Sequence, residues 1–466
     1  MQRRTFISIA LFISGMLLLL PNFYRNRWSA VDSEYYTEWQ TRYDRLVVAR
    51  LVKTRQDGFF SAGGLMGIGD AKEWEVNTRT NRHQFNTYAN KGEFQSYLIY
   101  KSNPGFQGLI YGVADKFLTL PAEQKLKLFR GFTAVASAVI FGFMVSAFAI
   151  EFGLFSGILV LIFAVLSTWI VLPAGSIFWS LWAFYLPFVA GAYLLADATR
   201  RNEYNSARIH SIIFIAVLIK ILCSGFDLTT TVLIMATVPF VFYGIYKNWD
   251  RRTFVTRLVK IGIVLLAASL TGLVILSIQI IASEGAIANA YSYILERLGH
   301  HAGGSSEFFN TPGVEVRAIT TFEVISKYLV MPAIAMQFQS STIQILYWHL
   351  MAVFALFTMI FVFRHKMTGG ASYPRKALGL LVATWYSLSA PLSWYILFKP
   401  HSFIHTHVNT MAWQMPFTLL GFALCGFVIH DIFNNSKKTL TSVPPLPASQ
   451  TDPPLQSDTY RPRPRA

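Results

Sequence analysis

The sequence predicts an all-α polytopic membrane protein with about ten transmembrane helices. Of its 466 residues, 53% are hydrophobic and only 14% are charged, whereas about a quarter of the residues of an average soluble domain are charged. The apolar residues form continuous blocks of about 20, the length that a helix needs to cross a bilayer. Because these blocks do not alternate with polar residues, they exclude a transmembrane β-barrel. They also exclude a soluble enzyme, a DNA-binding protein and a secreted disulfide scaffold.

The charge balance is basic, with 40 Lys and Arg against 24 Asp and Glu and a net charge of +16. We attribute this surplus to cytoplasmic loops, which are enriched in Lys and Arg in membrane proteins, and we predict no nucleic-acid partner. The two cysteines, Cys223 and Cys425, lie in or beside apolar segments. They cannot form a disulfide framework or a thiolate metal site.

The chain begins with a segment, residues 1–24, that we expect to be the first transmembrane helix. An apolar run from Phe6 to Leu20 has no small-residue cleavage site after it, which favours an uncleaved span over a signal peptide. Residues 25–129 form a long polar segment, the first extracytoplasmic loop, which is too aromatic to be disordered. Near-helical spacing from Tyr36 to Val52 and from Leu109 to Leu128 predicts two helices at the membrane surface.

Further apolar blocks predict the remaining spans. Transmembrane helices 2–7 are expected within residues 130–283, a second extracytoplasmic loop at 284–341, and helices 8–10 within 342–432. Residues 433–466 form a Pro-rich polar segment, predicted to be a disordered cytoplasmic tail. The blocks lie at 131–150, 153–173, 177–196, 209–224, 228–246, 260–282, 342–363, 377–398 and 409–431.

The distribution of Lys and Arg predicts that both termini lie in the cytoplasm. Under this N-in/C-in arrangement the inside connections carry the cations, including Arg200, Arg251 and Arg364, whereas the short outside connections carry almost none beyond Lys399. Both large loops then lie outside the cytoplasm. Since the unusual polar motifs fall in the loops and turns of that same side, we expect any chemistry to be extracytoplasmic.

Two carboxylates, Asp32 and Glu34, directly follow the first span. A carboxylate there could act as a general base or bind a metal, although solvated acids are also common in polar loops. Lys220 and Asp227 lie near the outer end of another span. Lys220 could hold a phosphate at the interface or could extend its ammonium to the membrane surface and pair with Asp227.

The segment from Trp394 to Asn409 is the densest polar cluster between two spans. It contains Lys399, His401, His405, His407 and Asn409, which could ligate a metal, contact a phosphate or sugar, or simply pack.

Two further segments hold substrate-site candidates. Arg297, in the second loop beside His300 and His301, could bind a phosphate through two parallel hydrogen bonds or anchor the loop at the surface. Tyr100 and Gln107 belong to a glycine-containing element where a substrate could approach the backbone.

Several motifs are missing from the sequence. It has no Walker-type glycine loop, no His-Glu-x-x-His and no Gly-x-Ser-x-Gly, so an ATP-driven pump and common hydrolases lack support. It also shows no internal repeat of the kind that many secondary transporters have.

The layout resembles the GT-C superfamily of integral membrane glycosyltransferases, nearest to uncharacterised bacterial members. The resemblance covers residues 1–432 and rests on one span followed by a large outer loop that begins with the acidic pair of Asp32 and Glu34. It implies that these carboxylates are catalytic and that a polyprenyl-phosphate-linked sugar is the donor. The residues implied in binding the lipid phosphate are Lys220, Arg297, Lys399, His401 and His405, with Asp227, His407, Asn409, Gln107 and Tyr100 as further substrate-site candidates.

The predicted function is therefore sugar transfer to an extracytoplasmic lipid or glycan acceptor, with inversion at the sugar and a first-loop carboxylate as general base. The expected location is the bacterial inner membrane, with the site facing the periplasm or the exterior. No cofactor is identified, and a divalent ion, Mg²⁺ or Mn²⁺, is left open. The alternative is a transporter or flippase for a lipid-linked or polar solute, which would place its polar residues near mid-membrane on several spans.

Overall fold

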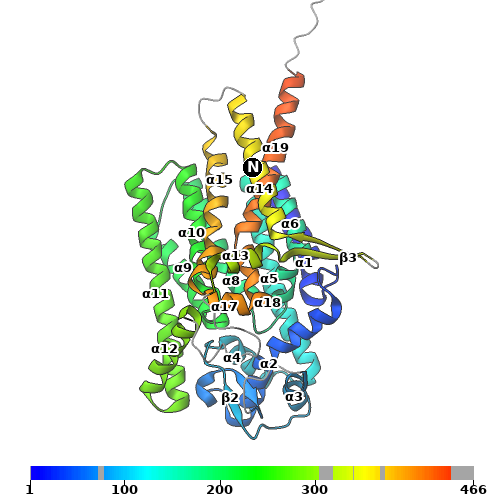
Figure 1. Cartoon of the computed structure of the whole chain (residues 1–466), viewed down its shortest axis with the longest axis vertical. Coiled ribbons are helices and arrows are strands. Elements are labelled where there is room, and N and C mark those ends of the chain that lie inside the picture. Colours follow the sequence, from blue (N-terminus) through cyan, green and yellow to red (C-terminus); the bar gives the residue numbers. More distant parts are fainter. Residues whose placement is uncertain (1, 72–77, 304–318, 339–340, 368–372, 442–466) are drawn as a thin grey trace, which may run out of the picture.

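The computed structural model describes residues 2–71, 78–303, 319–338, 341–367 and 373–441. The protein is an elongated helical bundle with a smaller folded region at one end (Figure 1). Helix α1 (Gln2–Arg25) begins and helix α19 (Phe417–Thr441) ends at the opposite end of the bundle. We call the smaller region the cap (residues 33–117).

The bundle confirms a polytopic membrane protein made mainly of helices. Eight helical segments are long and apolar enough to cross a membrane, and a ninth is obtained if one bent pair counts as a single span. The apolar part of α1, Ile9–Arg25, is shorter than these, so the number of about ten spans and the N-in orientation stay predictions. The eight are α5 (Ala122–Phe152), α8 (Leu181–Arg201), α9 (Ser206–Ser224), α10 (Thr229–Tyr246), α11 (Arg251–Glu284), α14 (Tyr347–Met367), the segment Arg375–Leu397 formed by α15 (Arg375–Ser387) and α16 (Ser389–Leu397), and Thr406–Phe433.

The span predicted over 153–173 is not continuous. It consists of α6 (Leu154–Leu166) and α7 (Thr168–Ala174), which are bent by 68° at Ser167. Ser167 has an extended backbone, and its hydroxyl accepts a hydrogen bond from Gln414 Nε2 at 3.1 Å. The polar side chain of a distant helix therefore occupies the break, which hydropathy alone could not predict.

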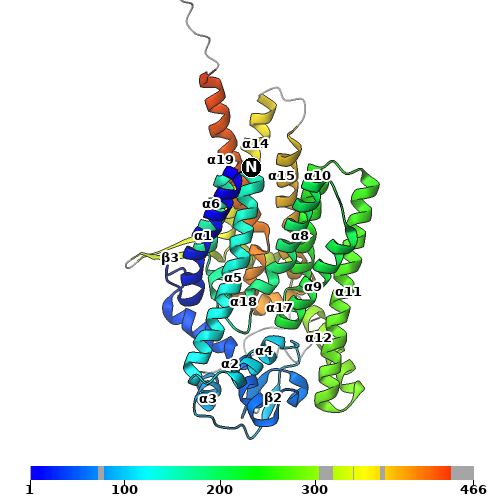
Figure 2. The ribbon, with the colours of Figure 1, turned by 180° about the vertical axis from the view of Figure 1, so that it is seen from behind.

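In the cap, α2 (Ser33–Asp57) confirms the helix predicted from Tyr36 to Val52. The single helix predicted from Leu109 to Leu128 is wrong, because α4 (Phe106–Phe117) ends at Leu118 and α5 begins at Ala122. Pro121 precedes α5, and the residue before a proline is disfavoured in the helical region. At 31 residues, α5 is about 46 Å long, longer than the roughly 30 Å hydrocarbon core, and its first turns lie beside α3 (Thr78–Ala89) of the cap (Figure 2).

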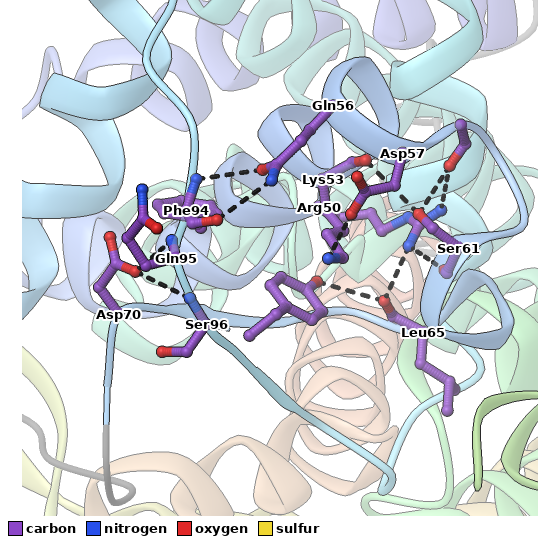
Figure 3. Close-up of polar contacts among 12 residues, drawn as sticks. Arg50, Lys53, Gln56, Asp57, Ser61, Leu65, Asp70, Phe94, Gln95 and Ser96 are labelled. Carbon is purple, nitrogen blue, oxygen red and sulfur yellow. Dashed lines mark hydrogen bonds and ion pairs between the residues drawn. The ribbon is translucent and has the colours of Figure 1, made fainter.

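The cap is organised around Arg50, which is fully buried. Its guanidinium donates hydrogen bonds to the carbonyl oxygens of Ser61 at 2.6 Å and of Gly58 and Leu65 at 3.4 Å, and also to that of Phe59 (Figure 3). Burial lowers the pKa of Arg50. The guanidinium thereby satisfies carbonyls of a segment with little regular structure.

Side-chain to backbone contacts fix the rest of the cap. Asp70 accepts hydrogen bonds from the backbone amides of Gln95 and Ser96 at 2.7 and 3.1 Å, and Gln56 exchanges two hydrogen bonds with the backbone of Phe94, both 3.1 Å (Figure 3). These contacts bring together strands β1 (Gly67–Gly69) and β2 (Tyr97–Ile99), which pair antiparallel with Ile68 opposite Leu98. The remaining elements of the cap are η1 (Ser61–Gly64) and α3 (Thr78–Ala89).

The fold is mainly helical, as predicted, and the second predicted loop also contains two short strands. Its helices are α12 (Ile287–Gly303) and α13 (Thr321–Leu329), followed by the antiparallel hairpin of β3 (Pro332–Phe338) and β4 (Ser341–Leu346). Strand β4 takes the start of the block predicted at 342–363, and α14 begins only at Tyr347. Helix α19 runs to Thr441, into the predicted tail, whereas 304–318 and 442–466 lie outside the described residues.

Arg50→Lys should destabilise the cap, because an ammonium cannot reach all four carbonyls and leaves buried acceptors unsatisfied. We expect a loss of about 2–3 kcal/mol, seen as a lower melting temperature in detergent and as faster proteolysis of the cap. Arg79→Lys, at an exposed position of α3, is the matched control and should behave as wild type. Equal stability of the two variants would contradict the role assigned to Arg50.

Candidate functional site

A buried carboxylate fixes the orientation of α2 over the bundle. Asp44 is fully buried, accepts a hydrogen bond from Arg130 Nε at 2.8 Å and another from the Ser176 hydroxyl at 2.8 Å. The backbone amide of Phe178 donates to the same carboxylate at 3.4 Å. These contacts join α2 to α5 and to the loop between α7 and α8, so α2 cannot rotate about its axis without breaking them.

With α2 fixed, one of its faces points towards the end of the bundle. Tyr35, Glu38 and Arg42 share a helical face because they are spaced by three and four residues. Burial raises the pKa of Tyr35, while the charge of Arg42 lowers it and that of Glu38 raises it. The three side chains are therefore close enough to interact electrostatically.

Aromatic rings continue this face towards the α7–α8 loop. Trp39 stacks on Trp179 with centroids 6.1 Å apart, and Tyr43 stacks on Phe178 at 5.9 Å. Burial is the main reason that the pKa of Tyr43 is raised, and the charge of Asp227 adds to it. Asp227, in the turn between α9 and α10, is thus within electrostatic range of Tyr43 of α2.

Lys220 of α9 forms hydrogen bonds with the backbone of that turn. It is 1% exposed, and its ammonium donates to the carbonyl oxygens of Gly225 at 2.9 Å and Asp227 at 2.6 Å and to the Thr229 hydroxyl at 3.3 Å. An ammonium has three N–H groups, and all three are occupied. Lys220 therefore closes the turn, and the charge of Asp227 acts on both Lys220 and Tyr43.

The glycine-containing element before α4 braces the same turn. Gln107 Nε2 donates to the Phe178 carbonyl at 3.0 Å, and the Tyr100 ring lies 6.1 Å from the Phe178 ring. Gly225 has a φ of +61°, and a Cβ there would lie 2.6 Å from the Ser102 carbonyl oxygen. Gln107 is buried, so its contact fixes the backbone of the α7–α8 loop at Phe178.

The histidine segment folds into two short helices, α17 (Lys399–Ile404) and α18 (Thr406–Asn409). The His401 and His405 rings are 4.7 Å apart, and the His405 and His407 rings are 5.7 Å apart. Asn409 Nδ2 lies 3.2 Å from His401 Nδ1. His407 is within electrostatic range of Arg42 of α2.

We call the residues gathered in this way the polar cluster. They come from α2, from the α9–α10 turn and from the histidine segment. The cluster contains Tyr35, Glu38, Arg42, Asp227, His405 and His407.

No group of three His, Cys, Asp or Glu side chains within the described residues could hold a metal ion.

An apolar groove of about 290 Å³ leads to the polar cluster. Its walls are formed by Leu270, Leu273 and Leu276 of α11, with side chains of α12 and α16 opposite. Leu270 is 52% exposed, so the groove lies at the outer surface of the bundle. Its polar end contains Asp227 and Thr229, together with Lys101, which forms an ion pair with Glu284.

The other predicted residues lie at several places. Asp32 is exposed and accepts a hydrogen bond from the backbone amide of Tyr35 at 2.9 Å, which caps α2, and Glu34 is exposed in the first turn. Lys399 is half-buried in the first turn of α17. The side chain of Arg297 lies outside the described residues, although its helix α12 packs against α17.

Glu38 and Arg42 were not predicted as site residues. Their spacing with Tyr35 was a usable signal, since it places three side chains with polar groups on one face of the helix. A comparison of the chain with protein-family models, curated proteins and solved structures found no match.

Asp44→Asn should loosen α2, because Arg130 would lose its charged partner. Since Arg130 is partly exposed, we expect a modest loss of about 2 kcal/mol, measured as a lower melting temperature in detergent. Asp57→Asn, in a surface pair with Lys53, serves as control and should change stability by less than about 0.5 kcal/mol. A melting temperature that is unchanged in Asp44→Asn would refute the role of this contact.

Proposed function

We propose that the protein is a membrane glycosyltransferase that transfers a sugar from a polyprenyl-phosphate donor to an extracytoplasmic lipid or glycan acceptor. The observation that carries this proposal is the apolar groove, which ends at the charged side chains around Asp227. A donor with an isoprenoid tail and an anionic head needs this combination. Its tail would lie along α11 while its phosphate reaches the polar cluster.

The cations near the polar cluster are the groups that would hold the phosphate. Arg42 has a planar guanidinium suited to two parallel hydrogen bonds with a phosphate, and Lys101 lies in the groove itself. Lys399 and His401 lie on α17 beside His405. Such cations would stabilise the negative charge that develops on the leaving phosphate.

The reaction needs a carboxylate that accepts a proton from the acceptor hydroxyl. The acceptor oxygen forms a bond to the anomeric carbon, the bond from that carbon to the phosphate oxygen breaks, and its electrons leave with the phosphate. Attack opposite the phosphate inverts the anomeric centre. We assign the base to Glu38, which shares the α2 face with Arg42, in preference to Asp32 and Glu34 at the start of that helix.

The position of the polar groups supports this enzyme over the transporter alternative. Asp227 follows α9, and the histidines follow α16, so both lie at helix ends. A transporter site usually lies near mid-membrane between broken helices. The bend at Ser167 is such a break, but it is filled by Gln414, whose amide also donates to the Tyr347 hydroxyl at 2.6 Å.

The test is mass spectrometry of envelope glycans and glycolipids from cells that lack the protein. A sugar modification should be absent and should return with wild type and with the control Glu123→Gln, which changes an exposed carboxylate of α5. With Glu38→Gln, the rate of sugar transfer should fall by about a hundredfold or more, the typical contribution of a general base.

The remaining variants distinguish the proposals. If Asp32→Asn with Glu34→Gln abolishes the modification while Glu38→Gln restores it, the base lies at the start of α2. If both carboxylate variants restore it fully, base catalysis from α2 is wrong and the transporter alternative is favoured.

Leu273→Trp should block the groove, because its side chain lines the wall and a larger ring would take the space of the lipid tail. The expected result is a raised KM for the long-chain donor with little effect on a donor analogue that has a short tail. Leu266→Trp, at an exposed position of the same helix, is the control. Equal loss with both donors would contradict a tail-binding role for the groove.

A further inference from the structure

The cap contains a second cavity. It is formed by other segments of the chain than the apolar groove, and its lining carries more charged side chains. It has a volume of about 830 Å³ and is bounded by the end of α2, the turn after α3, α4 and the start of α5. We propose that this cavity, the cap cleft, binds an anionic saccharide. The proposal rests on the cleft alone and does not depend on the sugar-transfer reaction.

The charge of the cleft is strongly positive. Its lining includes one carboxylate, Asp115, and four cationic side chains, Arg55, Lys91, Lys116 and Lys125. The carboxylate is already engaged, because Lys125 Nζ lies 2.9 Å from Asp115 Oδ1 and the Tyr88 hydroxyl also donates to it. The three other cations therefore set the potential inside the cleft.

These cations are held in place and accessible. Lys91 and Lys116 are exposed, and within the described residues neither forms an ion pair. Lys116 lies over the Phe59 ring, with its ammonium 5.5 Å from the centroid. Arg55 donates to the Gly92 carbonyl oxygen at 2.8 Å, which leaves other N–H groups of its guanidinium for a ligand.

The turn that carries Lys91 is closed by local hydrogen bonds. Lys91 has a φ of +54°, and the amides of Lys91 and Gly92 donate to the carbonyl oxygens of Tyr88 at 3.3 Å and Thr87 at 2.9 Å. A turn of this kind at the end of a helix is well defined. It therefore fixes the position of the Lys91 backbone at the edge of the cleft.

The size and position of the cleft select the ligand class. A volume of 830 Å³ falls within the roughly 300–1,000 Å³ of small-molecule sites and is much larger than one phosphate. The Phe59 and Tyr88 side chains supply apolar surface for sugar rings, and the Thr119 hydroxyl can exchange hydrogen bonds with sugar hydroxyls. The positive lining and the size of the cleft together select an anionic saccharide.

The test is calorimetric titration of the purified full-length protein in detergent with a hexamer of galacturonic acid. Wild type should bind it, and added salt should weaken the binding. The double variant Lys91→Gln with Lys116→Gln should bind at least about tenfold more weakly. Lys127→Gln removes a cation of α5 that pairs with Glu123 outside the cleft, and it should bind as wild type.

Three results would overturn the proposal. Maltohexaose, a neutral hexamer, could bind as tightly as the acidic one, which would remove the role of charge. The double variant could keep wild-type affinity at an unchanged melting temperature, which would place the binding elsewhere. Inorganic phosphate could match and displace the hexamer, which would make the cleft a phosphate site. Since binding is measured without turnover, each result is separate from the outcome of the glycan profiles.

Discussion

The arrangement of the polar residues depends on the buried carboxylate of Asp44. A surface helix that is polar on several faces has no hydrophobic pattern strong enough to fix its rotation, and α2 is such a helix. The contacts of Asp44 with Arg130, Ser176 and the Phe178 amide supply that constraint. Burying a charge is costly unless it is paired and hydrogen-bonded, so only one rotation of α2 satisfies it. In that rotation Arg42 lies within electrostatic range of His407.

The sequence predicted the membrane-spanning elements well because the requirement behind them is simple. A bilayer leaves no partners for backbone polar groups, so continuous apolar blocks form helices. The features that sequence analysis missed depend on contacts between distant segments. The bend at Ser167 is stabilised by Gln414. The close approach of the Gly225 backbone to Ser102 follows from a turn that Lys220 closes. The separation of α4 from α5 was predictable, since Pro121 marks it.

The candidate site was predictable only in part. The α9–α10 turn and the histidine segment stood out because polar residues are rare between spans, and the structure connects both to α2 through Tyr43 and Arg42. Lys220 illustrates the limit of this approach, because a buried charge is a functional hypothesis by default yet here all three of its N–H groups are bound internally. Glu38 and Arg42 were missed since their relevance depends on the rotation of α2, which sequence spacing does not fix.

The groove along α11 and the cap cleft differ in the polarity of their linings. The groove along α11 is lined by leucines and faces outwards from the bundle, so its occupant must be apolar over most of its length and charged only at the Asp227 end. The cap cleft is lined by cations and lies at the start of α5, so it favours an anionic occupant. Helix α2 lines the cap cleft with Arg55, near its end, whereas Arg42, nearer its start, belongs to the polar cluster. A rigid α2, anchored at Asp44 and Arg50, therefore holds the polar cluster and the cap cleft at a fixed separation.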